Sequence, residues 1–200
     1  MKQSNLKEVS TVDRNELLEQ ISWKTDELAH LVAEYWHQYS DYTNWQFWFV
    51  LFVLIAPLVL LYFTIDRNRL FEIFFFGYTV NMLWTMVEAV LTREGLFVYH
   101  YFLMPFLPSA TNMTTSLLPV SFLLLYQYCT NRGKNFHLYV LVLSALYAFV
   151  FANVEEYVGL LSLNRGMSNF YIFFIDVVIA YFSYWFTVFL LRFKEMPKFK

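Results

Sequence analysis

The sequence predicts an all-α protein, a polytopic membrane helical bundle of five transmembrane helices with an N-terminal amphipathic helix. Composition is the first observation: the 200 residues are 58% hydrophobic and 22% aromatic but only 15% charged. Average globular chains are about 45–50% apolar and about 25% charged. Spacing is the second observation, because several apolar stretches approach the ~20 residues that a helix needs to cross a bilayer. The charges gather in the N-terminal segment, in short breaks and in the tail, which favours an integral membrane protein in contact with the lipid bilayer.

Residues 1–44 are expected to stay outside the membrane, with a helix over 13–40. Asp13 is a candidate N-cap, and Glu16 follows at the spacing of a capping box. Apolar residues then recur at steps of three and four, as in one face of a helix: Leu17, Ile21, Leu28, Leu31, Tyr35 and Tyr39. The other face is acidic, whereas helices on membrane surfaces are usually basic. We therefore expect this helix to dock on the protein's own outer face or on a protein partner, including self-association.

Five apolar stretches, separated by short polar breaks, are predicted to span the membrane. They cover residues 45–65, 70–91, 114–130, 136–161 and 169–191. A sixth apolar stretch, 96–111, contains Pro105 and Pro108 and is too short to cross. Non-helical backbone at membrane depth has to be buried in protein or line a wet cavity. This segment is therefore expected to be an interfacial elbow or a re-entrant lid.

Basic residues predict the orientation, because they concentrate in short cytoplasmic loops. Alternate breaks and the tail 192–200 are the basic ones: Arg67, Arg69, Arg132, Lys134, Arg192, Lys194, Lys198 and Lys200. The opposite breaks carry only Arg93 and Arg165. We predict a multi-pass protein of the cell membrane with the N-terminus outside and a basic cytoplasmic C-terminal tail.

Several function classes lack their usual signals. Cys129 is the one cysteine, so an intramolecular disulfide framework and a cysteine-cluster metal site are excluded. The formal net charge of −2 gives no indication of nucleic-acid binding. Neither HExxH, nor a phosphate-binding glycine loop, nor GxSxG occurs. The sequence therefore favours a protein that is not an enzyme, and it identifies neither a cofactor nor a metal.

The chain from about Trp36 to Phe193 resembles the small, aromatic-rich, multi-span membrane proteins of endospore-forming Firmicutes, a family without an assigned activity. The resemblance rests on overall length, on WHQYSDYTNWQFW before the first span, on DRNR after it, and on VEEYVG in the fourth span. It implies the membrane class and implies no catalytic residues.

Acidic residues inside the apolar stretches are the candidate functional groups. The ligand- or cation-binding candidates are Glu88, Glu155, Glu156 and Asp176, with Asn153 and the deeper Asn81. At ~1.5 Å per residue, the four carboxylates lie about 5–10 Å from the predicted outer ends of three helices. A carboxylate facing hydrocarbon costs about 2.5–3.5 kcal/mol even on the most lenient scale. These side chains are therefore expected to face the interior of the bundle, in its outer half.

Three interpretations of this acidic group remain open. Arg93 or Arg165 could pair with the carboxylates and lock the helix ends together. The carboxylates could instead bind a proton, a cation or a small ligand, since carboxylate and amide oxygens suit hard cations. A membrane enzyme acting on a lipid or isoprenoid is the alternative, with His100 as a base in a lid. Carboxylates that converge without a basic partner would favour binding.

Glu155 and Glu156 are neighbours, so they point about 100° apart around a helix. Glu155 continues a stripe of small residues, Ser144, Ala148 and Ala152. We therefore predict that Glu155 faces the centre of the bundle, and that Glu156 reaches a neighbouring helix or a basic loop residue.

Overall fold

The structure, a computed structural model, describes residues 13–195, and most of them are helical. The α-helices are α1 (Arg14–Tyr35), α2 (Trp45–Thr64), α3 (Leu70–Arg93), α4 (Leu118–Arg132), α5 (Phe136–Leu146), α6 (Ala152–Tyr157) and α7 (Asn169–Glu195). Four short 3₁₀ or π segments adjoin them: η1 (Trp36–Ser40), η2 (Arg67–Arg69), η3 (Met113–Leu117) and η4 (Tyr147–Phe151). Two strands, β1 (Phe97–Tyr99) and β2 (Leu161–Leu163), complete the described fold.

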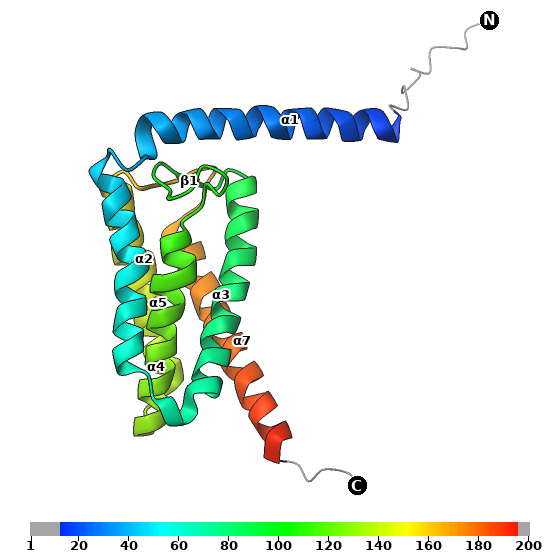
Figure 1. The fold of residues 1–200 in the computed structure, drawn as a ribbon. Helices are drawn as coiled ribbons and strands as arrows, with labels where there is room; N and C mark the ends of the chain where they lie inside the picture. Colours follow the sequence, from blue (N-terminus) through cyan, green and yellow to red (C-terminus); the bar gives the residue numbers. More distant parts are fainter. Residues whose placement is uncertain (1–12, 196–200) are drawn as a thin grey trace, which may run out of the picture.

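The long helices form an up-and-down bundle (Figure 1). Within residues 13–195, four segments are long and apolar enough to cross a membrane: Trp45–Thr64, Arg67–Arg93, Phe136–Tyr157 and Asn169–Phe193. Their inward faces, together with that of α4, bury a continuous apolar core in which Phe76, Val80, Phe122 and Val140 are fully enclosed. Their outward faces carry exposed aromatic and aliphatic residues, as expected where lipid replaces water. The coarse prediction of a helical bundle with several apolar membrane-length helices is confirmed.

A further helical segment, η3 followed by α4, packs against α2 and α3. The backbone at Leu117 is helical, so the two elements continue into one another. The predicted third span, 114–130, falls on this segment, which is not among the four above. Its hydroxyl and amide side chains make it the most polar of the helices in the bundle.

Residues 136–161 were predicted to form one helix, and here the structure differs. α5, η4 and α6 form a continuous helix that ends at Tyr157. Gly159 then takes a φ of 76°, in the left-handed region that glycine adopts without strain. The chain reverses and Leu161–Leu163 forms β2 instead of a helix end.

The two strands are far apart in the sequence but form an antiparallel pair at one end of the bundle. We call this end the hairpin end. Tyr99 lies opposite Leu161, and Phe97 lies opposite Leu163. Segment 96–111 is therefore a strand and a loop across the bundle end, as Figure 1 shows near the β1 label.

Helix α1 lies crosswise at the hairpin end, and its N-terminal half extends beyond the bundle (Figure 1). Asp13 is its N-cap residue but makes no side-chain capping hydrogen bond. None of the residues of α1 is buried. Leu17, Ile21, Leu28 and Leu31 of its apolar stripe are exposed, whereas Tyr35 at its C-terminal end contacts the loop after β1. Residues 1–12 and 196–200, which include part of the predicted N-terminal segment and tail, lie outside the described residues.

The other end of the bundle, which we call the tail end, is held together by a polar network. The Arg69 guanidinium bonds to Glu72, to the Thr130 hydroxyl at 3.0 Å and to Asn131. The Tyr126 hydroxyl donates to Glu72 Oε1 at 2.5 Å. These bonds join η2, α3 and α4 where the chain turns.

Candidate functional site

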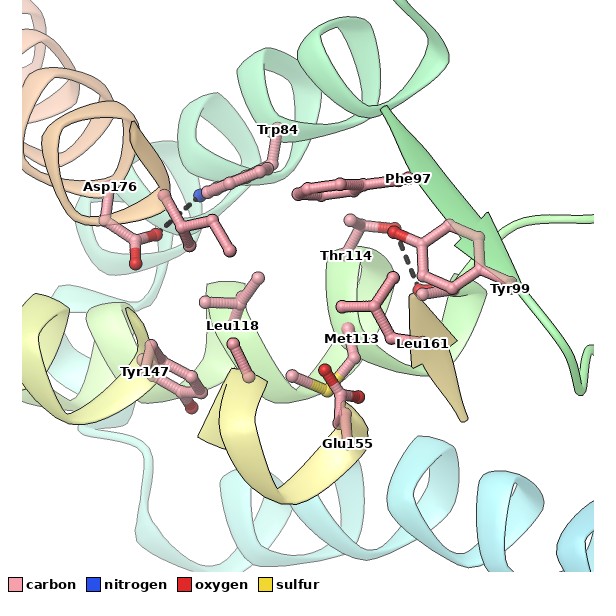
Figure 2. Close-up of a pocket in the computed structure, with 13 residues that line it drawn as sticks. Trp84, Phe97, Tyr99, Met113, Thr114, Leu118, Tyr147, Glu155, Leu161 and Asp176 are labelled. Carbon is pink, nitrogen blue, oxygen red and sulfur yellow. Dashed lines mark hydrogen bonds between the residues drawn. The ribbon is translucent and has the colours of Figure 1, made fainter. Parts of the chain in front are cut away.

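A cavity of about 50 Å³ lies inside the bundle near the hairpin end (Figure 2). It is lined by Trp84, Phe97, Tyr99, Ala110, Met113, Thr114, Leu118, Tyr147, Ala152, Glu155, Leu161, Ile172 and Asp176. The lining comes from α3, the strand pair, the η3–α4 segment, the α5–α6 stretch and α7, so every helical segment of the bundle except α2 contributes. Its volume is enough for a few water molecules.

Asp176 projects from α7 into this cavity and is only 1% exposed. Its Oδ1 accepts a hydrogen bond from the Trp84 indole N–H at 2.9 Å, as Figure 2 shows. Its Oδ2 is buried and has no hydrogen-bond partner among the described residues. A buried polar atom normally has a partner, so this oxygen is free to bind a proton or a water molecule from the cavity.

Glu88 lies behind the cavity wall on α3 and is 3% exposed. Its Oε1 accepts a hydrogen bond from the Ala110 backbone N–H at 2.8 Å. The hydroxyls of Tyr99 and Thr114, two residues that line the cavity, lie within hydrogen-bonding reach of the same carboxyl group. Glu88 therefore connects α3 to the start of η3 and to β1.

Glu155 projects from α6, and Figure 2 shows its carboxyl group beside Met113 and Leu161 in the cavity. Within residues 13–195 its carboxyl group has neither a hydrogen bond nor an ion pair. It is near enough to Glu88 for the two charges to repel each other. We call Glu88, Glu155 and Asp176 the acidic cluster.

Tyr99, from β1, lies between two members of the acidic cluster. Burial, followed by the charges of Glu88 and Glu155, holds the pKa of the Tyr99 phenol well above its ordinary value. The phenol therefore stays protonated and remains a hydrogen-bond donor toward the carboxyl groups.

Neither predicted arginine partner reaches the acidic cluster. In the part of the chain that the structure describes, the ion pairs are Lys24–Glu27 and Arg69–Glu72. Arg93 is exposed at the end of α3. Arg165 is also exposed and donates from Nη1 to the Glu94 carbonyl at 2.7 Å. The arrangement is therefore not the arginine-paired lock that one interpretation of the sequence required.

The two predicted asparagines lie outside the cavity. Asn81 donates from Nδ2 to the Thr114 carbonyl at 2.8 Å, which ties α3 to η3. Asn153 is exposed and donates to the Phe149 carbonyl at 2.6 Å. The Asn153 side-chain oxygen accepts from Asn169 Nδ2 at 3.0 Å. Both side chains bridge structural elements.

Glu156 and His100 also lie outside the cavity lining. Glu156 is exposed, and its Oε1 accepts from the Leu163 backbone N–H at 3.2 Å. The His100 ring bonds through Nε2 to the Ser162 hydroxyl at 2.8 Å. His100 therefore joins β2 to the loop after β1 and does not enter the cavity as a base.

Several residues that line the cavity were not singled out from the sequence. Trp84 is three residues from Asn81 and four from Glu88, so its position on the same face of α3 could have been read from spacing. The sequence near Tyr99 gave no indication that this residue lines the cavity, because its position depends on the pairing of β1 with β2. Tyr147 faces the cavity as part of a π segment, which shifts the helical register.

The acidic cluster is distributed around the cavity. Within the described chain, no three His, Cys, Asp or Glu residues are placed so that they could hold one metal ion. What the arrangement offers chemically is a set of buried carboxyl groups, a phenol donor and space for water. Such a set can bind and release protons.

Comparison of the chain with family models, with curated proteins and with solved structures finds no match. The resemblance to the small multi-span proteins of endospore-forming Firmicutes therefore stays a prediction. The cavity and the acidic cluster remain as the basis for a functional proposal.

Proposed function

We propose that the chain is an integral, multi-pass membrane protein that binds protons at the acidic cluster, in the outer half of its bundle. One observation carries the proposal: three buried or half-buried carboxyl groups come from three different helices and have no cationic partner within residues 13–195. An ionised carboxylate in hydrocarbon costs about 2.5–3.5 kcal/mol on the most lenient scale. Bound protons remove that cost.

The proposal includes five membrane spans. The η3 segment of 5 residues and α4 of 15 residues follow one another, and together they reach the ~20 residues that a span needs. Five spans leave the hairpin end and the tail end on opposite sides of the membrane.

Charge supports one orientation of these spans. The basic residues Arg67, Arg69, Arg132 and Lys134 gather at the tail end, and basic loops stay cytoplasmic. The hairpin end, the N-terminal amphipathic helix α1 and the acidic cluster then face the outside of the cell membrane. Protons reach the acidic cluster from that side.

Infrared spectroscopy of the reconstituted protein tests proton binding. Protonated carboxyl groups in an apolar site absorb apart from carboxylates, and pH-difference spectra detect the change. We expect the wild-type protein to show such a band, and Glu155→Gln and Asp176→Asn each to remove part of it. Glu156→Gln is the matched control, because Glu156 is the neighbouring glutamate but is exposed outside the cavity. It should leave the band unchanged.

Two results would contradict this proposal. One is a spectrum without a buried protonated carboxyl at any pH, or with a band that neither Glu155→Gln nor Asp176→Asn alters. The other is loss of the band on adding sodium at constant pH, because a cation would then be the occupant of the acidic cluster.

A further inference from the structure

The buried face of α7 carries three polar side chains, Asp176, Ser183 and Thr187, among apolar ones. Asp176, Ala180, Ser183 and Thr187 follow one another at steps of four, three and four, so they lie on one face. Their side chains are 1%, 0%, 0% and 1% exposed. Burying polar groups inside a membrane helix bundle is costly and typically marks a functional path. We call these four residues the α7 stripe.

Polar atoms on this face of α7 and on the neighbouring helix α5 have no protein partner. Among the described residues, Asp176 Oδ2 and Ser183 Oγ of α7 and Ser144 Oγ of α5 are buried without a hydrogen bond. Tyr181 donates to the carbonyl of His137, and this contact aligns α5 with α7 so that Ser144 lies near the level of Asp176. Unpaired buried hydroxyls cost free energy, and water is their usual partner. The stripe is therefore suited to hold water molecules in series.

The C-terminal residue of the α7 stripe, Thr187, borders a groove at the tail end of the bundle. Thr187 lines this groove of about 500 Å³ together with Arg69 and Glu72. The Glu72 side chain is 17% exposed, so it contacts both the groove and solvent. Asp176 at the other end of the stripe lines the cavity near the hairpin end. At ~1.5 Å per residue, the stripe covers about 16 Å of depth between the cavity and the groove.

We propose that the α7 stripe is a proton path from the acidic cluster to the groove at the tail end. The proposal rests on proton binding at the acidic cluster. A proton taken up by the cluster passes from Asp176 to water, then to the hydroxyls of Ser183 and Thr187, and leaves in the groove beside Glu72. Each transfer forms one O–H bond and breaks another. Counter-ion movement balances the net charge that crosses the membrane.

Ala180 marks the slow part of this path. Asp176 and Ser183 are seven residues apart, or about 10 Å along the helix axis. Hydrogen bonds between oxygens join atoms about 2.7–2.8 Å apart, so about two or three water molecules must enter this gap for each transfer. Ala180 is fully buried in the apolar core, so water enters the gap only when the neighbouring helices move apart, and this step limits the flux.

Proton flux into liposomes tests the path. The full chain is reconstituted with a pH-sensitive dye inside the liposomes, and valinomycin with a potassium gradient drives protons inward. We expect wild-type flux above that of empty liposomes. Ser183→Ala and Thr187→Val should each lower the flux about tenfold, which corresponds to about 1.4 kcal/mol in the barrier. Thr79→Val is the matched control, because Thr79 and Thr187 are both buried and both donate at 2.8 Å to the carbonyl four residues earlier.

The outcomes separate this path from proton binding itself. No wild-type flux, or unchanged flux in Ser183→Ala and Thr187→Val, overturns the path and leaves the infrared test of the acidic cluster unaffected. An equal loss in Thr79→Val overturns it too, because the effect would then not depend on the α7 stripe. Ala180→Ser covers the case in which Ser183→Ala fails to fold: a hydroxyl in the gap should raise the flux, and a flux that does not rise contradicts the path.

Discussion

Glu155 and Glu156 show how strongly environment differs between adjacent residues of one helix. Glu155 lines the cavity, whereas Glu156 is exposed and accepts a hydrogen bond from the Leu163 backbone N–H. The ~100° between neighbouring side chains of a helix is the cause. The same rule places Asp176 toward the cavity and Val178 toward the outside of the bundle. The chemistry of the site is thus set by single positions.

Gly77 is the residue at which close packing is most sensitive to one added carbon. A Cβ at this position would lie 2.6 Å from Leu123 Cδ1 and 3.2 Å from Leu123 Cβ. Gly77→Ala should therefore destabilise the protein by about 1–3 kcal/mol through overpacking, against a gain of about 0.5–1 kcal/mol from helix propensity. Thermal unfolding in detergent measures the difference.

The control for Gly77→Ala is the same change in a Leu123→Ala background. Leu123→Ala removes the Cδ1 atom of the 2.6 Å contact and leaves only the Cβ at 3.2 Å, so Gly77→Ala should destabilise much less in this background than in the wild-type protein. A destabilisation of equal size in both backgrounds would show that Leu123 is not what makes glycine necessary.

At the scale of elements, α1 is attached to the bundle through a few bonds at its C-terminal end. The Ser40 hydroxyl donates to the Phe102 carbonyl at 3.0 Å and accepts from the Phe102 N–H at 2.8 Å. The Trp36 indole N–H donates to the same carbonyl at 2.9 Å. The Tyr35 hydroxyl donates to the His100 carbonyl at 3.2 Å. The aliphatic residues of the stripe stay exposed, and docking of this face on a partner remains a prediction.

Ser40→Ala should loosen the joint between η1 and the loop after β1. Ser40 is fully buried, so its removal leaves the Phe102 N–H without its partner, at a cost of about 1–3 kcal/mol. We expect faster amide exchange at Phe102, with α1 itself unchanged in helicity. Hydrogen–deuterium exchange measures both.

Ser109→Ala is the control variant for Ser40→Ala at the contact between η1 and the loop after β1. Ser109 is half-buried in the same loop, and its hydroxyl contacts only the Thr111 hydroxyl among the described residues, at 3.3 Å. The variant should leave exchange at Phe102 unchanged. If Ser109→Ala and Ser40→Ala speed exchange equally, the loop and not the Ser40 hydroxyl controls the joint.

The whole molecule is asymmetric from end to end. The hairpin end carries the strand pair, the cavity and α1, whereas the tail end carries the Arg69 network and most basic loop residues (Figure 1). The α7 stripe runs between them. A membrane protein with this asymmetry has a defined orientation, because basic loops are retained in the cytoplasm.

Labelling of engineered cysteines in intact cells tests this orientation. In a Cys129→Ala background, Gln20→Cys on exposed α1 should react with a membrane-impermeant maleimide. Lys134→Cys, in the loop between α4 and α5, should react only after the membrane is permeabilised. Gln20→Cys that needs permeabilisation would reverse the proposed orientation, and reaction of both residues from outside would rule out an odd number of spans between them.

The sequence by itself determined the class, the membrane-length helices and the separation of charges between the two ends. These features depend on hydrophobicity and on periodicity within a single segment, so neighbouring residues are enough to predict them. The burial of Glu88 and Asp176 and the inward position of Glu155 also follow from local rules, because a carboxylate in an apolar helix has to face protein.

Only the tertiary structure decided which residues meet at the cavity. Trp84 and Asp176 are separated by 92 residues, and the pairing of β1 with β2 brings Tyr99 opposite Leu161. The Gly159 turn that ends the fourth helix early leads into that strand pair. The sequence places Arg93 and Arg165 near the carboxylates, but neither forms an ion pair with them among the described residues of the fold. Contacts between distant segments depend on how whole helix faces pack together, and no periodicity within one segment encodes that choice.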